Sequence, residues 1–222
     1  MTAGDGYFTL GTRSCEEVVE RKSRFIAQVS PVFNEEDALS FIKAVKESHK
    51  TAGHHCFAYI IGINAGLMRY QDDGEPQGTA GIPILEVLKK NNLVNCVAVV
   101  TRYFGGILLG TGGLARAYSA SAAKAVKAAG IVRAEKSVRL SALVAYAFWD
   151  QVSYTLGKLP VCDVEKEFTD KVLLHLTVRE QDLAMLQQEL ISLCDGSIPM
   201  ELSDACYHLW PAAELTDKFR NL

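Results

Sequence analysis

The sequence predicts an α+β protein of two domains: strands and helices mixed over residues 1–136, and a ferredoxin-like domain over 137–212. A chain of 222 residues is long for one ordinary domain. After residue 136 the pattern changes to strand, helix, strand, strand, helix, strand, which is the order of a split βαβ domain. The charge also changes: residues 1–136 contain 16 Lys and Arg and 13 Asp and Glu, whereas residues 137–222 contain 7 Lys and Arg and 13 Asp and Glu. Any polyanion should therefore meet the first part.

The overall composition, 49% hydrophobic and 22% charged, is typical of a globular protein in water. The N-terminal stretch lacks the basic flank and apolar run of a secretory signal, so we expect a cytoplasmic protein without a membrane partner. The six cysteines form no C-x-x-C pair, and we expect them to be small hydrophobes in neither disulfides nor a metal site. They are Cys15, Cys56, Cys96, Cys162, Cys194 and Cys206.

The first domain opens with strand-like apolar runs and a helix. We expect strands at 7–10 and 23–32, joined by a turn, and a helix that Asn34 caps and Asp37 supports from three residues later. Two further strands are expected at 56–63 and 67–71.

The rest of the first domain contains its strongest strand signal. Pro83 fits the first turn of a helix that ends near Asn91 or Asn92. Residues 93–104 are apolar at nearly every position, which predicts a central strand buried on both faces. The alanine-rich run 114–130 predicts a helix ended by its glycine.

In the second domain the pattern predicts a strand near 138–146, a short helix, a hairpin around Thr169 and Asp170, and an amphipathic helix capped by Asp182 or residues just before it. A single strand within 197–210 should close the domain. The polar tail 213–222 is expected to fray.

A glycine-rich segment follows the central strand and leads into a helix. This arrangement places free backbone N–H groups and the positive end of a helix dipole together, which favours an anion such as phosphate. Two flanking arginines would add bidentate contacts. The alternative is that the glycines only allow positive φ and close packing. The candidate residues are Arg102, Gly105, Gly106, Gly110, Thr111, Gly112, Gly113 and Arg116.

An earlier segment, residues 72–81, combines three carboxylates with proline and glycines. Asp72, Asp73 and Glu75 are candidates for a hard cation, for a general base, or for satisfying backbone amides in tight turns, and they can also hold Arg102 or Arg69 in place. The turn role is the default interpretation.

Other polar and aromatic residues near these segments have simpler interpretations. His54 and Thr79 are candidate supporting residues, and strand alternation puts His54 on the same face as Cys56, where a lone histidine is usually structural. The aromatics Tyr103, Phe104 and Tyr118 are expected in the core. Three cations in "ERKSRF" (20–25) extend a basic face or form a solvated strand edge.

Four segments together resemble the IMPACT/YigZ family: "KSRFIA", "HHCFAYIIG", "DDGEPQGTAGIPILEVL" and "VVTRYFGGILLGTGGLARAY". The resemblance implies an N-terminal α/β sandwich like the second domain of a small-subunit ribosomal protein and domain IV of elongation factor G. It also implies a second domain similar to domain V of that factor. Some members have a lysine where this chain has Leu108. Eukaryotic members regulate translation and carry an additional RWD domain, which we do not expect in this chain.

Three functions fit these observations. The leading hypothesis is a nonenzymatic protein that binds RNA or the ribosome through the second glycine segment, possessing no cofactor and no resident metal. The runner-up is an enzyme or binding protein for a phosphorylated small molecule, with the acidic segment as base or magnesium ligand. The third is an interaction module whose acidic second domain docks a basic partner. The sequence does not define an oligomeric state.

Overall fold

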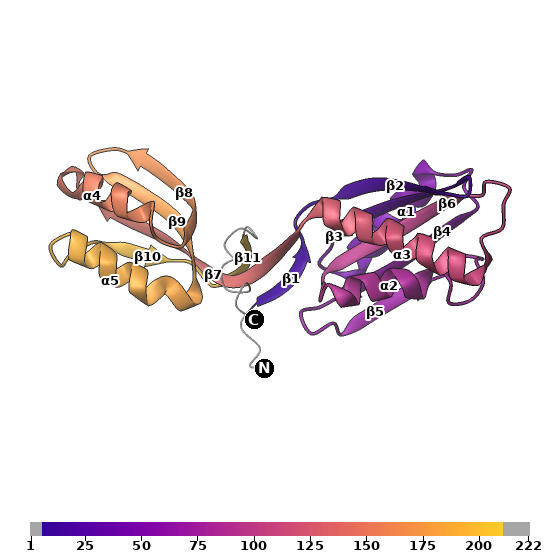
Figure 1. Ribbon diagram of the computed structural model, residues 1–222. Helices are drawn as coiled ribbons and strands as arrows, with labels where there is room; N and C mark the ends of the chain where they lie inside the picture. Colours follow the sequence, from indigo (N-terminus) through magenta and orange to yellow (C-terminus); the bar gives the residue numbers. More distant parts are fainter. Residues whose placement is uncertain (1–5, 211–222) are drawn as a thin grey trace, which may run out of the picture. The chain divides into compact units, whose positions relative to one another are not determined.

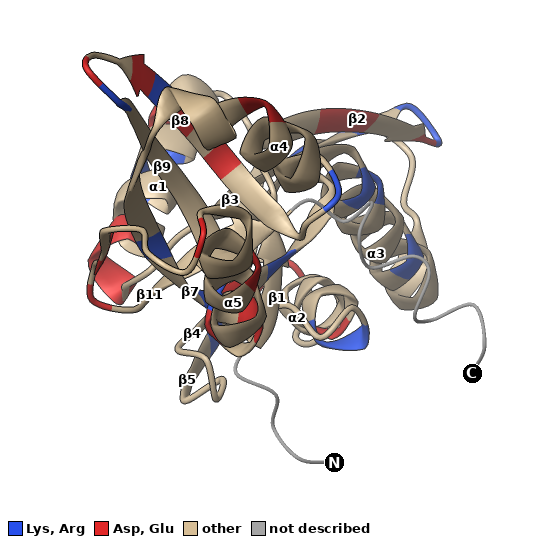
Figure 2. Cartoon of the chain, turned by 90° about the vertical axis from the view of Figure 1, so that its left-hand side faces the viewer, with Lys and Arg blue, Asp and Glu red and all other residues tan. Residues whose placement is uncertain are grey.

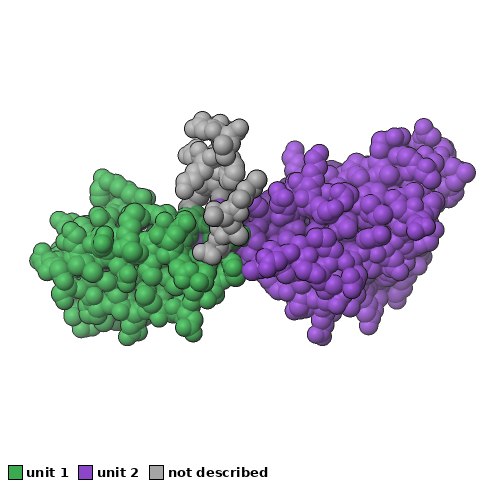
Figure 3. Space-filling view, turned by 90° about the horizontal axis from the view of Figure 1, so that it is seen from below, with its two compact units in different colours: residues 1–6, 135–208 green, residues 7–134, 209–222 purple. Residues whose placement is uncertain are grey.

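The computed structural model describes residues 6–210 and is mixed α/β, with two antiparallel sheets and five α-helices in that range (Figure 1). The chain divides into two compact units (Figure 3). Of the described residues, 7–134 with Leu209 and Trp210 form the larger unit, and 135–208 with Gly6 form the smaller. Neither unit has a described helix with the length and apolar character needed to cross a membrane.

The 7–134 unit is built on a sheet of five strands in the order β2-β3-β6-β4-β5, every pair antiparallel. The apolar strand β6 is central, as the sequence predicted, because its side chains are buried on both faces of the sheet. The strands are β2 (Ser14–Glu20), β3 (Ser23–Pro31), β4 (His54–Ile61), β5 (Leu67–Gln71) and β6 (Cys96–Tyr103).

Helices cover both faces of this sheet. Val97 and Val99 of β6 pack with α1 (Glu35–Ser48), whereas Ala98 and Val100 belong to the core formed with the other two helices. Alternate residues of one strand therefore support two cores. The helices on the second face are α2 (Gly81–Lys90) and α3 (Gly110–Ala129).

Helix α1 begins as the sequence predicted. The Asn34 side chain accepts a hydrogen bond from the Asp37 amide at 2.8 Å, and its own amide group donates to the Asp37 carboxylate at 2.9 Å. This reciprocal pair satisfies an orphan N–H of the first turn and fixes the start of the helix.

The 135–208 unit has a sheet in the order β10-β7-β9-β8, with β1 (Gly6–Leu10) and β11 (Cys206–Trp210) also paired to β7. Leu140, Leu174, Leu176, Leu186 and Leu190 are among the residues of its core. From β7 to β10 the elements follow the expected order of strand, helix, strand, strand, helix, strand. They are β7 (Ile131–Val144), α4 (Tyr146–Leu156), β8 (Val161–Phe168), β9 (Val172–Arg179), α5 (Leu183–Leu193) and β10 (Met200–Leu202), with a 3-10 turn at Glu180–Asp182.

Several boundaries differ from the sequence prediction. The turn expected after residue 10 contains a whole strand, β2. The sequence did not predict this strand because its glutamates lie on a half-exposed strand that has no apolar run. Strand β7 begins at Ile131, before the expected domain boundary, and the single closing strand is two short ones, β10 and β11. The Asp182 side chain makes no capping hydrogen bond to α5.

Cysteines behave as the sequence predicted in one respect: no two of the six form a disulfide. Cys56, Cys96 and Cys194 are buried, and Cys15 and Cys206 are exposed. The tail 213–222 lies outside the described residues.

Candidate functional site

The two glycine-rich segments meet at a pocket of about 430 Å³ in the 7–134 unit. One wall comes from the loop between β5 and α2, and the other from the loop after β6 and the first turn of α3. The lining is polar at one side and apolar around it. It consists of His54, Glu75, Pro76, Arg102, Phe104, Leu108, Leu109, Gly110, Thr111 and Leu114.

The loop before α2 is held by Asp72. Its carboxylate accepts hydrogen bonds from the amides of Gly78, Ala80 and Gly81 at 2.8, 3.0 and 2.8 Å. The amides of Ala80 and Gly81 are orphan N–H groups at the start of α2, so Asp72 caps this helix from outside it, and the Gly78 amide fixes the preceding loop. Its oxygens are thereby committed to the backbone.

Asp73 is committed in the same way. Its carboxylate accepts from the His55 amide at 2.7 Å and from Lys46 at 3.3 Å. Partial burial acts to raise the pKa of Asp73, but the His55 amide and the Lys46 ammonium outweigh it and hold the pKa below its usual value. Thr79 is buried and donates to the Pro76 carbonyl at 2.6 Å. Asp72, Asp73 and Thr79 do not line the pocket.

Glu75 and Arg102 form a buried ion pair in the pocket wall. The guanidinium Nη1 lies 2.6 Å from Glu75 Oε1, and the two side chains are 6% and 3% exposed. The Arg102 guanidinium also lies against the rings of Phe25 and Phe104, at 5.5 and 5.4 Å from their centroids. Two buried charges are stable here because each has a partner and the cation has aromatic faces.

The same Glu75 oxygen accepts a hydrogen bond from the Tyr118 hydroxyl at 2.8 Å. Cys56 donates to the Asp72 carbonyl at 2.9 Å and lies 3.4 Å from the Tyr118 oxygen. Burial raises the pKa of the Cys56 thiol to about 12, and burial also raises the pKa of Tyr118. Neither group is poised as a nucleophile at neutral pH.

His54 is oriented by a backbone carbonyl. Its Nδ1 lies 2.8 Å from the Asp73 oxygen, and because a carbonyl only accepts, Nδ1 carries the proton. Its Nε2 lies 3.9 Å from Glu75 Oε1. The pocket therefore has a polar side formed by an imidazole, a carboxylate and a guanidinium whose Nε has no hydrogen-bond partner among the described residues.

Helix α3 begins at Gly110, four residues earlier than the sequence predicted, so four of the candidate residues form its first turn. No side chain caps this end, and the first turn has no acidic residue. The first amides of an uncapped helix attract an anion. Two of them belong to Gly110 and Thr111, which line the pocket.

The glycines before the helix serve packing and backbone geometry. A Cβ on Gly105 would lie 2.0 Å from the Lys22 carbonyl carbon, so only glycine fits. Gly106 has a φ of 82° with open space around it. By contrast, Gly112 and Gly113 have no positive φ, so the backbone does not require glycine at these two positions.

Arg102 and Arg116 do not bracket one spot, contrary to the sequence interpretation. Arg102 is buried against Glu75, whereas the exposed Arg116 lines a neighbouring hollow of about 230 Å³ with Arg21. Leu109 lines both cavities. Figure 2 shows Lys and Arg along α3 and in the turn that follows β2. The cations that line this hollow are Arg116 and Arg21, and both are exposed.

The structure brings together five of the predicted site residues: His54, Glu75, Arg102, Gly110 and Thr111. Sequence reasoning missed the apolar walls. Phe104, expected in the core, is 56% exposed, and Leu108 is 82% exposed. The signal for Phe104 was its position at the end of the strand, next to Gly105, where burial stops.

The carboxylates of the acidic segment contact other groups of the protein. Within residues 6–210, Asp72, Asp73 and Glu75 belong to no group of three metal-ligating side chains. Their oxygens bond amides, Lys46, Arg102 and Tyr118 instead.

Comparison with known proteins identifies the class. Residues 21–126 match the Impact N-terminal domain. IMPACT family member YvyE of Bacillus subtilis (strain 168) is 36% identical over 201 residues, 90% of this chain and 93% of the relative. The chain therefore belongs to the IMPACT family.

Two further relatives extend over most of the chain. IMPACT family member YigZ of Escherichia coli (strain K12) is 31% identical over 185 residues, 81% of this chain and 89% of its own. A crystal structure described as that of a hypothetical protein is 29% identical, with a TM-score of 0.58 over 88% of this chain and 96% of that one. The similarity therefore includes both units.

Proposed function

We propose that this protein binds RNA, free or on the ribosome, and acts in translational control, with the 7–134 unit as the contact surface. One phosphate sits on the first-turn amides of α3, an adjacent phosphate meets Arg116 and Arg21, and a base stacks on Phe104. The family domain covers this surface, since it spans residues 21–126. The proposal includes the fold similarity that the resemblance implies, to a domain of a small-subunit ribosomal protein and to two domains of elongation factor G.

A single observation carries the proposal: the uncapped N-terminus of α3 opens onto a pocket. A helix dipole and unpaired amides are a ready phosphate site. A second, independent feature is Arg102, which lines the pocket and whose buried Nε–H has no partner among the described residues. A buried unpaired donor is costly unless a ligand or water accepts from it.

The shape of the surface favours a strand of nucleotides. The pocket and the hollow of Arg116 share Leu109, so a chain of phosphates can pass from one to the other. Phe104 presents an exposed aromatic face, on which every base can stack. The exposed cations Arg21 and Arg116 provide the sequence-independent part of the affinity.

The test is binding of the purified full-length chain to labelled single-stranded RNA, structured RNA and ribosomal subunits over a salt series. Arg116→Ala should weaken binding and lower the slope of log affinity against log salt by about 1. Lys127→Ala is the matched control, since Lys127 is exposed at the other end of the same helix. Leu108→Lys adds a cation at the pocket rim and should strengthen binding.

Two results would overturn the proposal. One is absence of binding to all three partners at low salt. The other is an equal loss of affinity in Arg116→Ala and Lys127→Ala, because contact with the α3 N-terminus requires the nearer cation to matter more.

A second candidate, a site for a phosphorylated small molecule, is favoured by the polar side of the pocket. His54, Glu75 and Arg102 can hydrogen-bond a ligand whose phosphate lies at α3. A thermal-shift screen of nucleotides and sugar phosphates, with and without magnesium, distinguishes it from RNA binding. Stabilisation by one compound that is lost in His54→Gln supports the small-molecule site, and no stabilisation by any compound rejects it.

A further inference from the structure

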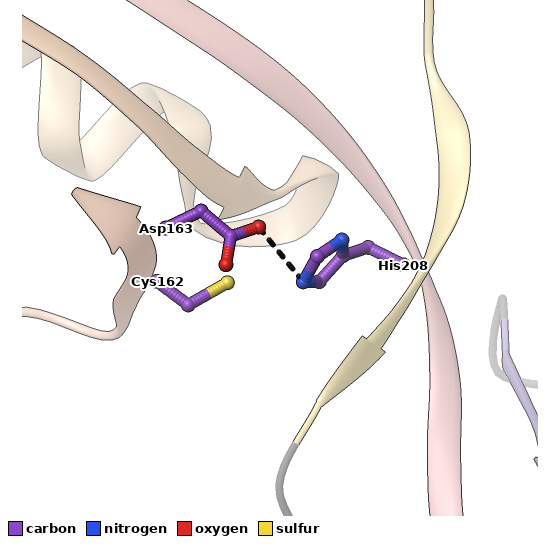
Figure 4. A group of neighbouring side chains, drawn as sticks. All are labelled: Cys162, Asp163 and His208. Atoms are coloured by element: carbon purple, nitrogen blue, oxygen red, sulfur yellow. Dashed lines mark ion pairs between the residues drawn. The ribbon is translucent and has the colours of Figure 1, made fainter. Parts of the chain in front are cut away.

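Three potential metal ligands converge in the 135–208 unit. Cys162 and Asp163 lie on β8, and His208 lies on β11 (Figure 4). Their ligand atoms all lie within 4.8 Å of one another. His208 Nε2 lies 3.2 Å from Asp163 Oδ2. Figure 4 shows the thiol and the carboxylate side by side, both facing the imidazole.

Adjacent residues of a regular strand point to opposite faces, so a local distortion is needed to bring Cys162 and Asp163 together. The β8–β9 register shifts between Cys162 and Glu165, which marks a β-bulge. Asp163 has a φ of 49°, an uncommon conformation for a residue other than glycine. The bulge turns both side chains to one side, and such bulges often re-aim a functional side chain.

We propose that Cys162, Asp163 and His208 bind a zinc ion. Zinc takes sulfur, nitrogen and oxygen ligands in a tetrahedron with bond lengths of about 2.0–2.3 Å, which places the ligand atoms about 3.3–3.6 Å from one another. The separation of 3.2 Å between the imidazole nitrogen and the carboxylate oxygen is close to this value. Three protein ligands leave the fourth position for water.

The ligand chemistry selects this class of metal. A thiolate with an imidazole suits zinc and other late transition metals, whereas magnesium and calcium prefer oxygen ligands only. The site joins β8, at one edge of the β10-β7-β9-β8 order, to β11, which pairs with β7. Bound zinc therefore ties together two segments that are distant in the sequence, and it should stabilise this unit.

The experiment uses the full-length chain, purified without a histidine tag and freed of metal by a chelator. Cobalt(II) replaces zinc as a coloured probe, and its absorption shows a thiolate charge-transfer band only if a cysteine sulfur binds it. We expect this band at one equivalent of cobalt, its displacement by zinc, and a higher melting temperature with zinc. Cys162→Ser should abolish the band, and His208→Gln and Asp163→Asn should weaken cobalt binding at least tenfold.

Cys15→Ser is the matched control, because Cys15 is an exposed cysteine in the other unit. It should leave the band and the zinc stabilisation intact. The proposal is wrong if no thiolate band forms in the wild-type chain, or if the band persists in Cys162→Ser. Circular dichroism checks that each variant folds; should Cys162→Ser unfold, unchanged cobalt affinity in both His208→Gln and Asp163→Asn overturns the site.

Discussion

Replacing Glu75 by glutamine tests whether the buried ion pair organises the pocket wall. The Glu75–Arg102 separation of 2.6 Å corresponds to about 6 kcal/mol of attraction at an effective dielectric constant of about 20. The glutamine oxygen still accepts one hydrogen bond from the cation, which recovers about 1.5–3 kcal/mol. We therefore expect Glu75→Gln to lower the free energy of unfolding by about 3–5 kcal/mol, the range seen when one partner of a buried pair is removed.

The assay is equilibrium urea denaturation followed by far-UV circular dichroism, taking the transition of the 7–134 unit. Glu86→Gln is the control, since Glu86 pairs with Lys89 on the surface and is 58% exposed, so its loss should cost less than about 1 kcal/mol. The double variant Glu75→Gln with Arg102→Met should be more stable than Glu75→Gln alone, because no buried charge remains unpaired. If Glu75→Gln costs no more than Glu86→Gln, the ion pair does not have the role inferred for it.

Three further predictions concern single positions. Gly105→Ala should destabilise the 7–134 unit by about 3 kcal/mol or more, since its Cβ would lie 2.0 Å from the Lys22 carbonyl carbon, whereas Gly112→Ala should stabilise it by about 0.5 kcal/mol; urea denaturation measures both. Asp73→Asn should lower stability at neutral pH, because the Asp73 carboxyl stabilises the fold only when it is ionised. The difference from wild type should vanish as the pH falls below about 4 and through the depressed pKa of Asp73. Melting temperature measured against pH tests this, and a difference that stays constant with pH contradicts it. Thiol labelling of the native protein at mildly alkaline pH, read by mass spectrometry, should modify the exposed Cys206 and spare Cys56, because burial raises the pKa of the Cys56 thiol to about 12. Labelling of Cys56 in the native protein would contradict this by showing that its thiol is accessible.

The elements that the sequence predicted well are those with strong apolar periodicity. The central strand β6 and the capped helix α1 are examples, since burial on both faces and an asparagine cap leave clear patterns. Strand β2 was missed because an edge strand needs only one half-buried face, and its glutamates resemble a solvated turn. The start of α3 was misplaced because glycine disfavours helix locally, and packing of Leu114 and Tyr118 into the core overrides that preference.

The candidate site was predictable only where its residues form a local sequence pattern. Local sequence indicated that two glycine segments and a helix start could serve a ligand, and the pocket lies there. The interpretation that the carboxylates hold Arg102 or Arg69 is confirmed for Arg102, which Glu75 holds. The sequence left the choice open because burial of this arginine depends on a partner 27 residues away and on two aromatic faces. Cys162 and His208 could not be associated from spacing either, since only the β8 bulge and the position of β11 bring them together.

Arg102 and Arg116 have different environments, so we expect their substitutions to affect stability and binding differently. The charge of Arg102 is already balanced by Glu75 and its side chain is only 6% exposed, so it attracts an incoming phosphate weakly. Arg116 is exposed and forms no ion pair with a described residue, so its full charge faces solvent. Arg102→Ala should therefore act first on the free energy of unfolding, by leaving Glu75 as an unpaired buried charge. Arg116→Ala should leave unfolding nearly unchanged and act on affinity and its salt dependence. Measuring both quantities on both variants distinguishes a residue that builds the pocket from one that meets the ligand, and the reverse pattern would place the anion at the Arg102 guanidinium instead.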